Sequence, residues 1–161
     1  MAQIVVGQTV GVTGSAAITV KESMQGASLY LDFVNAQGGV GGQKIELVVL
    51  DDKFDTKLTL ENARTLIEKH GAIALFMTRG TPHTQGIVPL LDEAGVVLVG
   101  PSTGAMALHK PVSRHVFNVR APYQLEVEKA ITHLNTLGVE RIGVIHVDDS
   151  FGADALSGAL N

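Results

Sequence analysis

The sequence predicts an α/β protein with a doubly wound, largely parallel sheet in the three-layer αβα arrangement. Short runs rich in Val, Ile and Leu alternate along the chain with longer segments of helical periodicity. This alternation is typical of parallel strands buried on both faces and joined by right-handed crossovers. Glycine and polar residues gather directly after the strands, so we expect these loops at one edge of the sheet. The loops are 8–15, 51–55, 78–84, 100–104, 120–124 and 148–152.

The composition is that of a folded domain and excludes several classes of function. Of 161 residues, 45% are hydrophobic and 17% are charged, which is enough to form a core and too apolar for a disordered chain. A net charge of -4 with scattered Lys and Arg argues against a nucleic-acid partner. The absence of cysteine excludes thiol catalysis, thiolate metal sites and disulfides. No apolar run approaches the roughly 20 residues of a membrane span, and the N-terminus lacks the features of a signal peptide.

The first half of the chain is predicted as strand, helix, strand, helix and strand. The expected ranges are 4–7, about 20–36, 45–50, 55–71 and 73–77. In the first helix Met24, Leu31 and Val34 recur on one face, as a helix on a sheet requires. For the second helix, Asp55 or Thr56 is the expected N-cap, and its end falls at a glycine.

The second half repeats the alternation. Thr81 is the expected N-cap of a helix that has Pro82 at its first position and ends at Gly95. Further strands are expected at 96–99, 116–119 and 142–147, with helices at 126–137 and from 153 onward. The segment 120–123 has the pattern of a crossing between subdomains. We therefore expect one lobe over 1–120 and an incomplete second one over 121–161.

The loop Gly100–Gly104 is the most informative of the polar loops. It follows an apolar strand and offers the hydroxyl groups of Ser102 and Thr103, while Thr81 begins the preceding helix. Hydroxyls and backbone N–H groups at helix N-termini suit an anion such as a carboxylate.

Aromatic and histidine side chains give weaker signals. Tyr123 and Phe151 each follow a strand edge in a polar loop, which favours a ligand-site wall over the core. The six histidines show no paired ligand spacing, so we expect no metal site and place most of them at the surface.

Three other chemistries have partial support. The loop 7–14 follows a strand but has neither the dinucleotide-binding glycine spacing nor the ending of a phosphate loop. Asp51 and Asp52 resemble the Mg²⁺-binding pair of phospho-accepting receiver domains, yet helix capping and solvated charge explain them better. Ser102 fits the G-x-S-x-G spacing of a nucleophile elbow, but the last histidine, His146, falls inside a predicted strand.

Six blocks of the sequence carry a resemblance to a known family. They are 35–52, 80–82, 100–104, 116–121, 140–144 and 148–152. The first begins N-A-Q-G-G-V-G-G-Q-K-I, and together they resemble the periplasmic branched-chain amino acid (Leu/Ile/Val) binding protein family. The resemblance covers essentially the whole chain, which is less than half of a two-lobed family member.

The resemblance implies a ligand site at specific positions. The implied residues are Thr81, Ser102, Thr103, Gly104, Tyr123 and Phe151. The first four correspond to the neighbourhood of the ligand's carboxylate. Phe151 matches an aromatic position that is often tyrosine in the family, so its apolar wall is expected without the hydroxyl. Tyr123 departs from the Asp or Ser that the family often has nearby, and the acid that usually pairs with the ammonium is expected beyond residue 161.

The function implied by the resemblance is that of the non-enzymatic solute-binding component of an ABC importer. It would hold an amino acid of branched-chain type, or a related amide, between two lobes, with no cofactor. Hinge closure would then be sensed by a membrane permease. The expected location is the periplasm, as a mature form. The alternatives are a regulatory sensor of the same fold and a serine hydrolase using Ser102. Apolar surface left by an incomplete second lobe predicts self-association.

Overall fold

Five parallel strands form one sheet in the order β2-β1-β3-β4-β5. The computed structural model describes residues 3–161. The strands are β1 (Ile4–Val10), β2 (Ile45–Asp51), β3 (Ala74–Phe76), β4 (Val97–Val99) and β5 (Val116–Phe117). The helices are α1 (Ala17–Ala36), α2 (Thr56–Glu68), α3 (Thr81–Ala94), the 3₁₀ turn η1 (Met106–Leu108), α4 (Tyr123–Thr136) and α5 (Ser150–Leu160). The predicted α/β class with a parallel sheet is confirmed.

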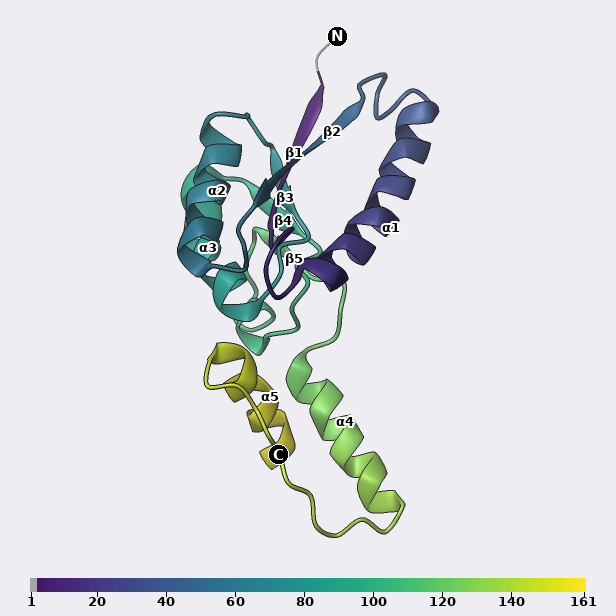
Figure 1. The fold of residues 1–161 in the computed structure, drawn as a ribbon, viewed down its shortest axis with the longest axis vertical. Coiled ribbons are helices and arrows are strands. Elements are labelled where there is room, and N and C mark those ends of the chain that lie inside the picture. The colour runs from purple at the N-terminus through teal and green to yellow at the C-terminus, as the bar shows by residue number, and fades with distance from the viewer. Residues whose placement is uncertain (1–2) are drawn as a thin grey trace.

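Helices cover both faces of the sheet, which makes the three layers (Figure 1). α1 lies on one side, and α2 and α3 lie on the other. The strand order reverses at β1, because β2 lies on one side of it and β3 to β5 lie on the other. Ligands of open α/β sheets bind outside the carboxyl ends of the strands at such a reversal.

The main core lies between the sheet and the helices α2 and α3. Leu66, Leu75, Ile87, Leu91 and Leu98 are each fully buried there. These side chains come from α2, β3, α3 and β4. Burial of this much aliphatic surface is the main stabilising term for the unit.

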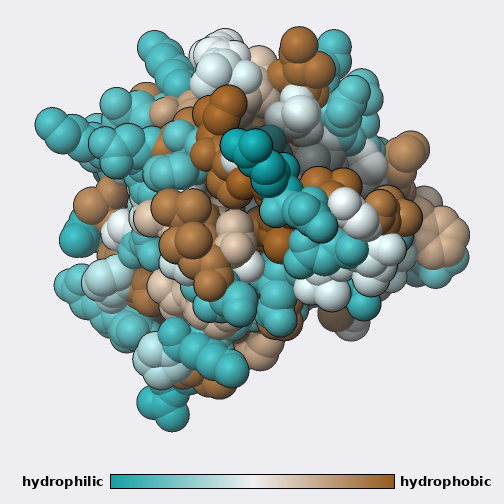
Figure 2. All heavy atoms as spheres, turned by 90° about the horizontal axis from the view of Figure 1, so that it is seen from below, coloured by the Kyte–Doolittle hydropathy of each residue, from teal (hydrophilic) through white to brown (hydrophobic). Residues whose placement is uncertain are grey.

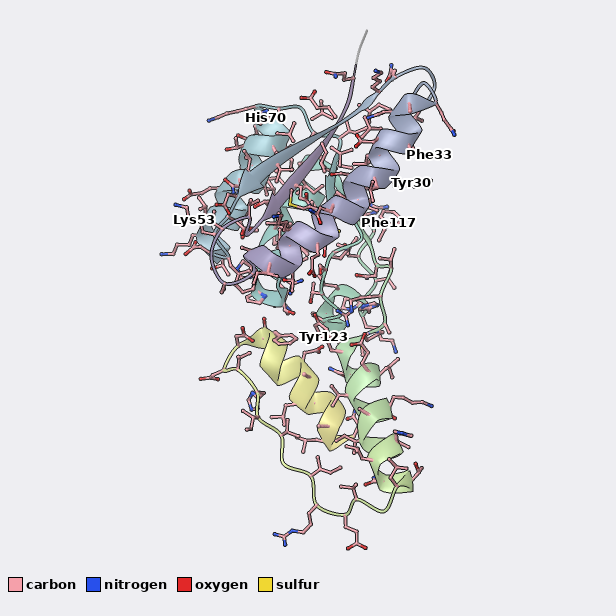
Figure 3. The ribbon with its side chains drawn as sticks, turned by 45° about the vertical axis from the view of Figure 1, so that its right-hand side comes forward. Tyr30, Phe33, Lys53, His70, Phe117 and Tyr123 are labelled. Atoms are coloured by element: carbon pink, nitrogen blue, oxygen red, sulfur yellow. The ribbon has the colours of Figure 1, made fainter. Side chains whose placement is uncertain are left out.

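The α1 side of the sheet is packed more loosely. Val20 is buried, and Met24 is half-buried against the same small cluster. Tyr30 and Phe33, on the outer side of α1, are exposed and stack on each other with ring centroids 6.3 Å apart (Figure 3).

The glycine-rich turn between α1 and β2 is fixed by Asn35. Its side-chain amide donates to the carbonyl of Ile45, and its oxygen accepts from the Ile45 N–H, each over 2.8 Å. Gly39 has φ +77°, and a Cβ there would lie 2.0 Å from the Gln43 carbonyl oxygen. The turn therefore needs both residues for local structural reasons.

The predicted strand at 142–147 is wrong. These residues form no strand, and Ile145 is fully exposed. A β-strand depends on ladder hydrogen bonds to a neighbour, and within residues 3–161 no strand lies beside this segment. The other strands stand where the pattern predicted, although β3 and β5 are shorter and β1 continues to Val10.

α4 and α5 lie beyond the carboxyl ends of the strands, with their N-terminal ends toward the sheet (Figure 1). α4 has no buried residue. Viewed from this end, the surface carries apolar side chains interspersed with polar ones (Figure 2). Among the helices within residues 3–161, none combines the length and the apolar character that a bilayer crossing needs.

Candidate functional site

A cavity of about 270 Å³ lies between the loops that follow the strands and the N-terminal ends of α4 and α5. Its lining residues come from five separate segments of the chain. They are Phe54, Arg79, Gly80, Thr81, Pro82, His83, Ser102, Tyr123, Val147, Asp149 and Phe151. The cavity combines a cation, hydroxyls and aromatic rings, whereas a wider hollow of about 830 Å³ along α1 is lined mostly by apolar side chains.

The loops after β3 and β4 are joined beyond the ends of the strands. Arg79 and Ser102 form a parallel bridge, and the Ser102 N–H donates to the Thr78 carbonyl over 2.7 Å. Behind the cavity the hydroxyls of Thr81 and Thr103 hydrogen-bond over 2.7 Å, and both side chains are buried. This pairing fixes the first turn of α3 against the loop after β4, as a preformed polar site requires.

Thr81 is not the N-cap of α3. That position belongs to Gly80, with φ +92°, and no side chain caps the helix. The Thr81 hydroxyl is engaged with Thr103 across the two loops, so it does not fold back onto the amides of its own helix. A Cβ on Gly80 would lie 2.5 Å from Nδ1 of His83, which accounts for a glycine here.

Asp51 and Asp52 hold the loop that follows β2. Asp52 is buried and accepts hydrogen bonds from the hydroxyls of Thr9 and Thr59 and from the Phe54 N–H. The expectation of solvated charge is therefore wrong for Asp52, because the fold surrounds it with donors.

Asp51 accepts from the Thr13 hydroxyl and from two backbone N–H groups, those of Thr13 and Lys53. The Thr13 hydroxyl, followed by the backbone donors, holds the pKa of Asp51 below its ordinary value. Asp55 is the N-cap of α2, as predicted, and accepts from the N–H groups of Lys57 and Leu58.

This loop presents Phe54 to the cavity. Phe54 has φ +60°, a conformation that L residues rarely adopt, and its N–H is tied to Asp52 over 2.9 Å. Its ring stacks on His83 with centroids 4.2 Å apart and planes at 25°. His83 is buried, contrary to the surface position expected of most histidines, because Phe54 and the first turn of α3 enclose it.

The opposite wall is built by α4 and α5. Tyr123 and Phe151 meet edge to face, with ring centroids 5.1 Å apart. Tyr123 lies at the start of α4, between that helix and α5 (Figure 3). The guanidinium of Arg120 lies 4.6 Å from the Tyr123 ring centroid, and its Nη2 donates to both carboxylate oxygens of Glu126, each over 2.6 Å. The hydrogen bond to Glu126 raises the pKa of Arg120 above its ordinary value.

Two contacts tie this wall to the sheet unit. Asp154 of α5 accepts from the Met106 N–H over 3.1 Å and from the Gln124 side chain over 2.8 Å. The Tyr123 N–H donates to the Gly104 carbonyl over 2.7 Å. A Cβ on Gly104 would lie 2.5 Å from the Ala121 carbonyl oxygen, so this position needs glycine for the crossing of the two chain segments.

The structure brings four of the six predicted site residues to the cavity. Thr81, Ser102, Tyr123 and Phe151 line it. Thr103 lies behind them, bonded to Thr81, and Gly104 lies at the crossing.

Among the lining residues that sequence reasoning did not assign to the site, four have charged or aromatic side chains, which are Phe54, Arg79, His83 and Asp149. All four lie in loops that were predicted to converge after the strands. For Phe54, Arg79 and His83, position just beyond a strand end was the available signal, but it does not tell which side chain of a loop faces inward. Asp149 follows the segment 142–147, which forms no strand.

Ser102 lacks the partners of a catalytic serine. Its Oγ lies 3.5 Å from a guanidinium nitrogen of Arg79, and within residues 3–161 no imidazole hydrogen-bonds to it. His146 contacts the carbonyl of Val147 at the surface. The described part of the chain also contains no cluster of three side chains able to hold a metal ion.

A cavity outside the carboxyl ends of a parallel sheet, closed on its far side by a second unit, is the arrangement of a cleft-type ligand-binding protein. Comparison with known proteins identifies the family. Residues 3–161 match the family described as periplasmic binding protein. The chain belongs to this family.

Individual relatives agree with that assignment. An amino acid binding protein of Pseudomonas aeruginosa is 30% identical over all of this chain and 44% of its own length. A substrate-binding periplasmic protein of Ralstonia solanacearum superposes with a TM-score of 0.92 at 37% identity, over 98% of this chain and 44% of that one. The branched-chain amino acid transporter substrate binding protein of Streptococcus pneumoniae, in complex with isoleucine, is 25% identical with a TM-score of 0.71 over 81% of this chain and 39% of its own. The chain thus spans less than half the length of the relatives it matches.

Proposed function

We propose that this chain carries the ligand cleft of the solute-binding component of an ABC importer, and that it binds an amino acid or a related amide without transforming it. The observation that supports this most is the convergence of Thr81, Ser102 and Arg79 on one cavity at the N-terminus of α3. Hydroxyls, a guanidinium and helix N–H groups are donors that suit a carboxylate. The Pseudomonas relative is named for amino acid binding, and the Streptococcus relative holds isoleucine.

In this function residues 1–120 form the first lobe and 121–161 begin the second. The ligand would rest on the first lobe and draw the second toward it, because the cavity has walls from both. A permease that recognises the closed form is the expected partner, and the periplasm is the expected location. Self-association of the chain through exposed apolar residues such as Ile145 is a further expectation, checked by light scattering at high concentration.

A titration of the twenty common amino acids, followed by two-dimensional amide NMR, tests the proposal. We expect a few of them to shift the amide signals of 79–83 and 102–104, and to raise the melting temperature progressively as their concentration exceeds the Kd. Succinate and ethylamine serve as controls for unspecific charge effects. The proposal fails if no amino acid or amide shifts these signals at millimolar concentration.

A further inference from the structure

The cavity is unusually rich in flat rings for this chain. The sequence has only five phenylalanines, two tyrosines and no tryptophan. Phe54, Tyr123 and Phe151 nevertheless all line the cavity, and the imidazole of His83 adds a fourth ring. Rings placed on opposite walls can hold a flat group by stacking and edge-to-face contacts, which are worth more than the buried area alone.

The wall of the cavity that Phe54 and His83 form is preorganised. The carboxylate of Asp52 ties the Phe54 backbone in its left-handed conformation, and His83 supports the ring from behind. Both rings lie close to Gly80, and a Cβ there would lie 3.1 Å from Phe54 Cε2, so the stacked pair needs a glycine at this position. A rigid aromatic surface loses little conformational entropy when a ligand ring docks on it.

Arg79 is the cation of the cavity that is left available to a ligand. A guanidinium nitrogen lies 3.5 Å from the Ser102 Oγ, and within residues 3–161 no carboxylate comes within ion-pair distance. Arg120, at the edge of the same region, is by contrast held by both oxygens of Glu126. Because a guanidinium presents a planar fork of donors, Arg79 suits a bidentate carboxylate.

Asp149 supplies the opposite charge on the far wall. Its Oδ1 caps α5 by accepting from the N–H groups of Phe151 and Gly152, each over 2.9 Å. Oδ2 makes no hydrogen bond within the described residues. The cavity therefore offers a cation beside Ser102 and an anion beside Phe151, which matches the two charges of an α-amino acid.

We propose that the cleft selects an α-amino acid with a flat aromatic side chain, with its carboxylate on Arg79, its ammonium on Asp149 and its ring between Phe54 and Phe151. This proposal rests on the proposed function and narrows it. The ring selectivity also sets this chain apart from an aliphatic amino acid binder, because a branched side chain fills volume without stacking.

Matched ligands separate ring shape from size and charge. L-phenylalanine is compared with L-cyclohexylalanine, which has the same skeleton but a puckered ring, and with L-leucine. We expect phenylalanine to bind about threefold to tenfold more tightly than either, the range that aromatic pairing supplies. Binding is followed by amide NMR at residues 79–83 and 149–152.

Protein variants then assign the two charges. Arg79→Gln is expected to raise the Kd of phenylalanine about tenfold or more, but to leave the Kd of phenethylamine, which lacks a carboxylate, unchanged. Asp149→Asn keeps a good helix cap. It is expected to raise the Kd of phenylalanine but not the Kd of 3-phenylpropanoate, which lacks the ammonium. Arg64→Gln on the exposed face of α2 and Asp148→Asn are the matched controls, and the amide spectrum verifies that each variant is folded.

The outcomes separate this inference from the function on which it rests. A Kd of leucine that is equal to or lower than the Kd of phenylalanine overturns the ring selectivity and leaves the amino acid function standing. An unchanged Kd of phenylalanine in Arg79→Gln overturns the carboxylate assignment. If no amino acid binds at all, the proposed function itself is wrong.

Discussion

The sheet unit and the α4–α5 unit have the same strand–helix pattern in sequence but differ in how they are packed. In the sheet unit Leu75 and Leu98 are fully buried between helices and neighbouring strands. In the other unit α4 has no buried residue, and Ile145 is fully exposed where a strand was predicted. The difference teaches that an apolar β-branched run becomes a buried strand only where another strand stands beside it.

The two walls of the cavity also differ in how firmly they are held. The sheet-side wall is fixed by buried hydroxyl pairs and by the carboxylate of Asp52, whereas the α5 wall is attached through Asp154 and the crossing at Gly104. A ligand would therefore meet a preformed surface on one side and a more loosely attached one on the other. A hinge motion that brings the two walls together would use the chain segment that crosses between them at Gly104.

The largest expected effect is the difference in stability cost between truncating a core side chain of the sheet unit and truncating an exposed one of the other unit. Leu98→Ala is expected to destabilise the chain by about 3 kcal/mol, because it leaves a cavity in a close-packed core. Ile145→Ala is expected to cost less than about 0.5 kcal/mol, since the side chain is already in water. Urea unfolding followed by circular dichroism measures both. Equal costs for the two variants would contradict the packing difference.

The next effect concerns the hydroxyl pair behind the cavity. Thr81→Val and Thr103→Val are each expected to cost about 1–2 kcal/mol, because each leaves the other buried hydroxyl without its threonine partner. Thr103→Val also removes the acceptor of the Ala105 N–H. The double variant should cost clearly less than the sum, since both polar groups are then gone. Additive costs in the urea midpoints would show that the two hydroxyls do not depend on each other.

A smaller effect is expected where the two units are joined. Asp154→Ala removes the acceptor for both Met106 and Gln124, and should loosen α5 by about 1 kcal/mol. Amide exchange in 150–160 should quicken while β1 and β4 keep their protection. Asp148→Ala, an exposed neighbour, is the control and should change neither region. Faster exchange throughout the chain would mean that the units are not separable.

The smallest effect is the pH dependence of the loop that follows β2. Because the folded pKa of Asp51 is lowered, the unfolded chain binds its proton at a higher pH, and stability is lost as the pH falls through the folded pKa. Thr13→Val removes the main donor and should flatten this loss, by about 0.5 kcal/mol for so exposed a group. Melting temperatures between about pH 5 and pH 2 measure the slope. An unchanged slope would show that Thr13 does not set the pKa.

Local signals predicted much of the fold. The alternation of strands and helices, the N-cap at Asp55 and the helix-ending Gly95 follow from periodicity and capping, which depend on neighbouring residues alone. The end of α2 was predicted too late, because the helix stops at Glu68 with Lys69 as its C-cap, before Gly71. The segment 142–147 could not be predicted this way, because a strand needs a partner that its own residues do not encode.

The candidate site divides in the same manner. The loop of Ser102 was predicted because its position after a strand places it at one edge of the sheet. Phe151 lines the cavity although the strand predicted before it, at 142–147, is not formed. Phe54 and His83 were missed because hydrogen bonds to Asp52, a close approach at Gly80 and a positive φ orient them. None of these contacts has a sequence pattern of its own.

Hydrogen exchange with and without amino acid tests the central claim most directly. The claim is that one ligand bridges a preformed wall on the sheet unit and a mobile wall on α5. With L-phenylalanine, and separately with L-leucine, at saturating concentration, we expect residues 79–84 and 147–152 to gain protection together, with the larger gain in 147–152. Protection of neither segment by either amino acid would contradict the account.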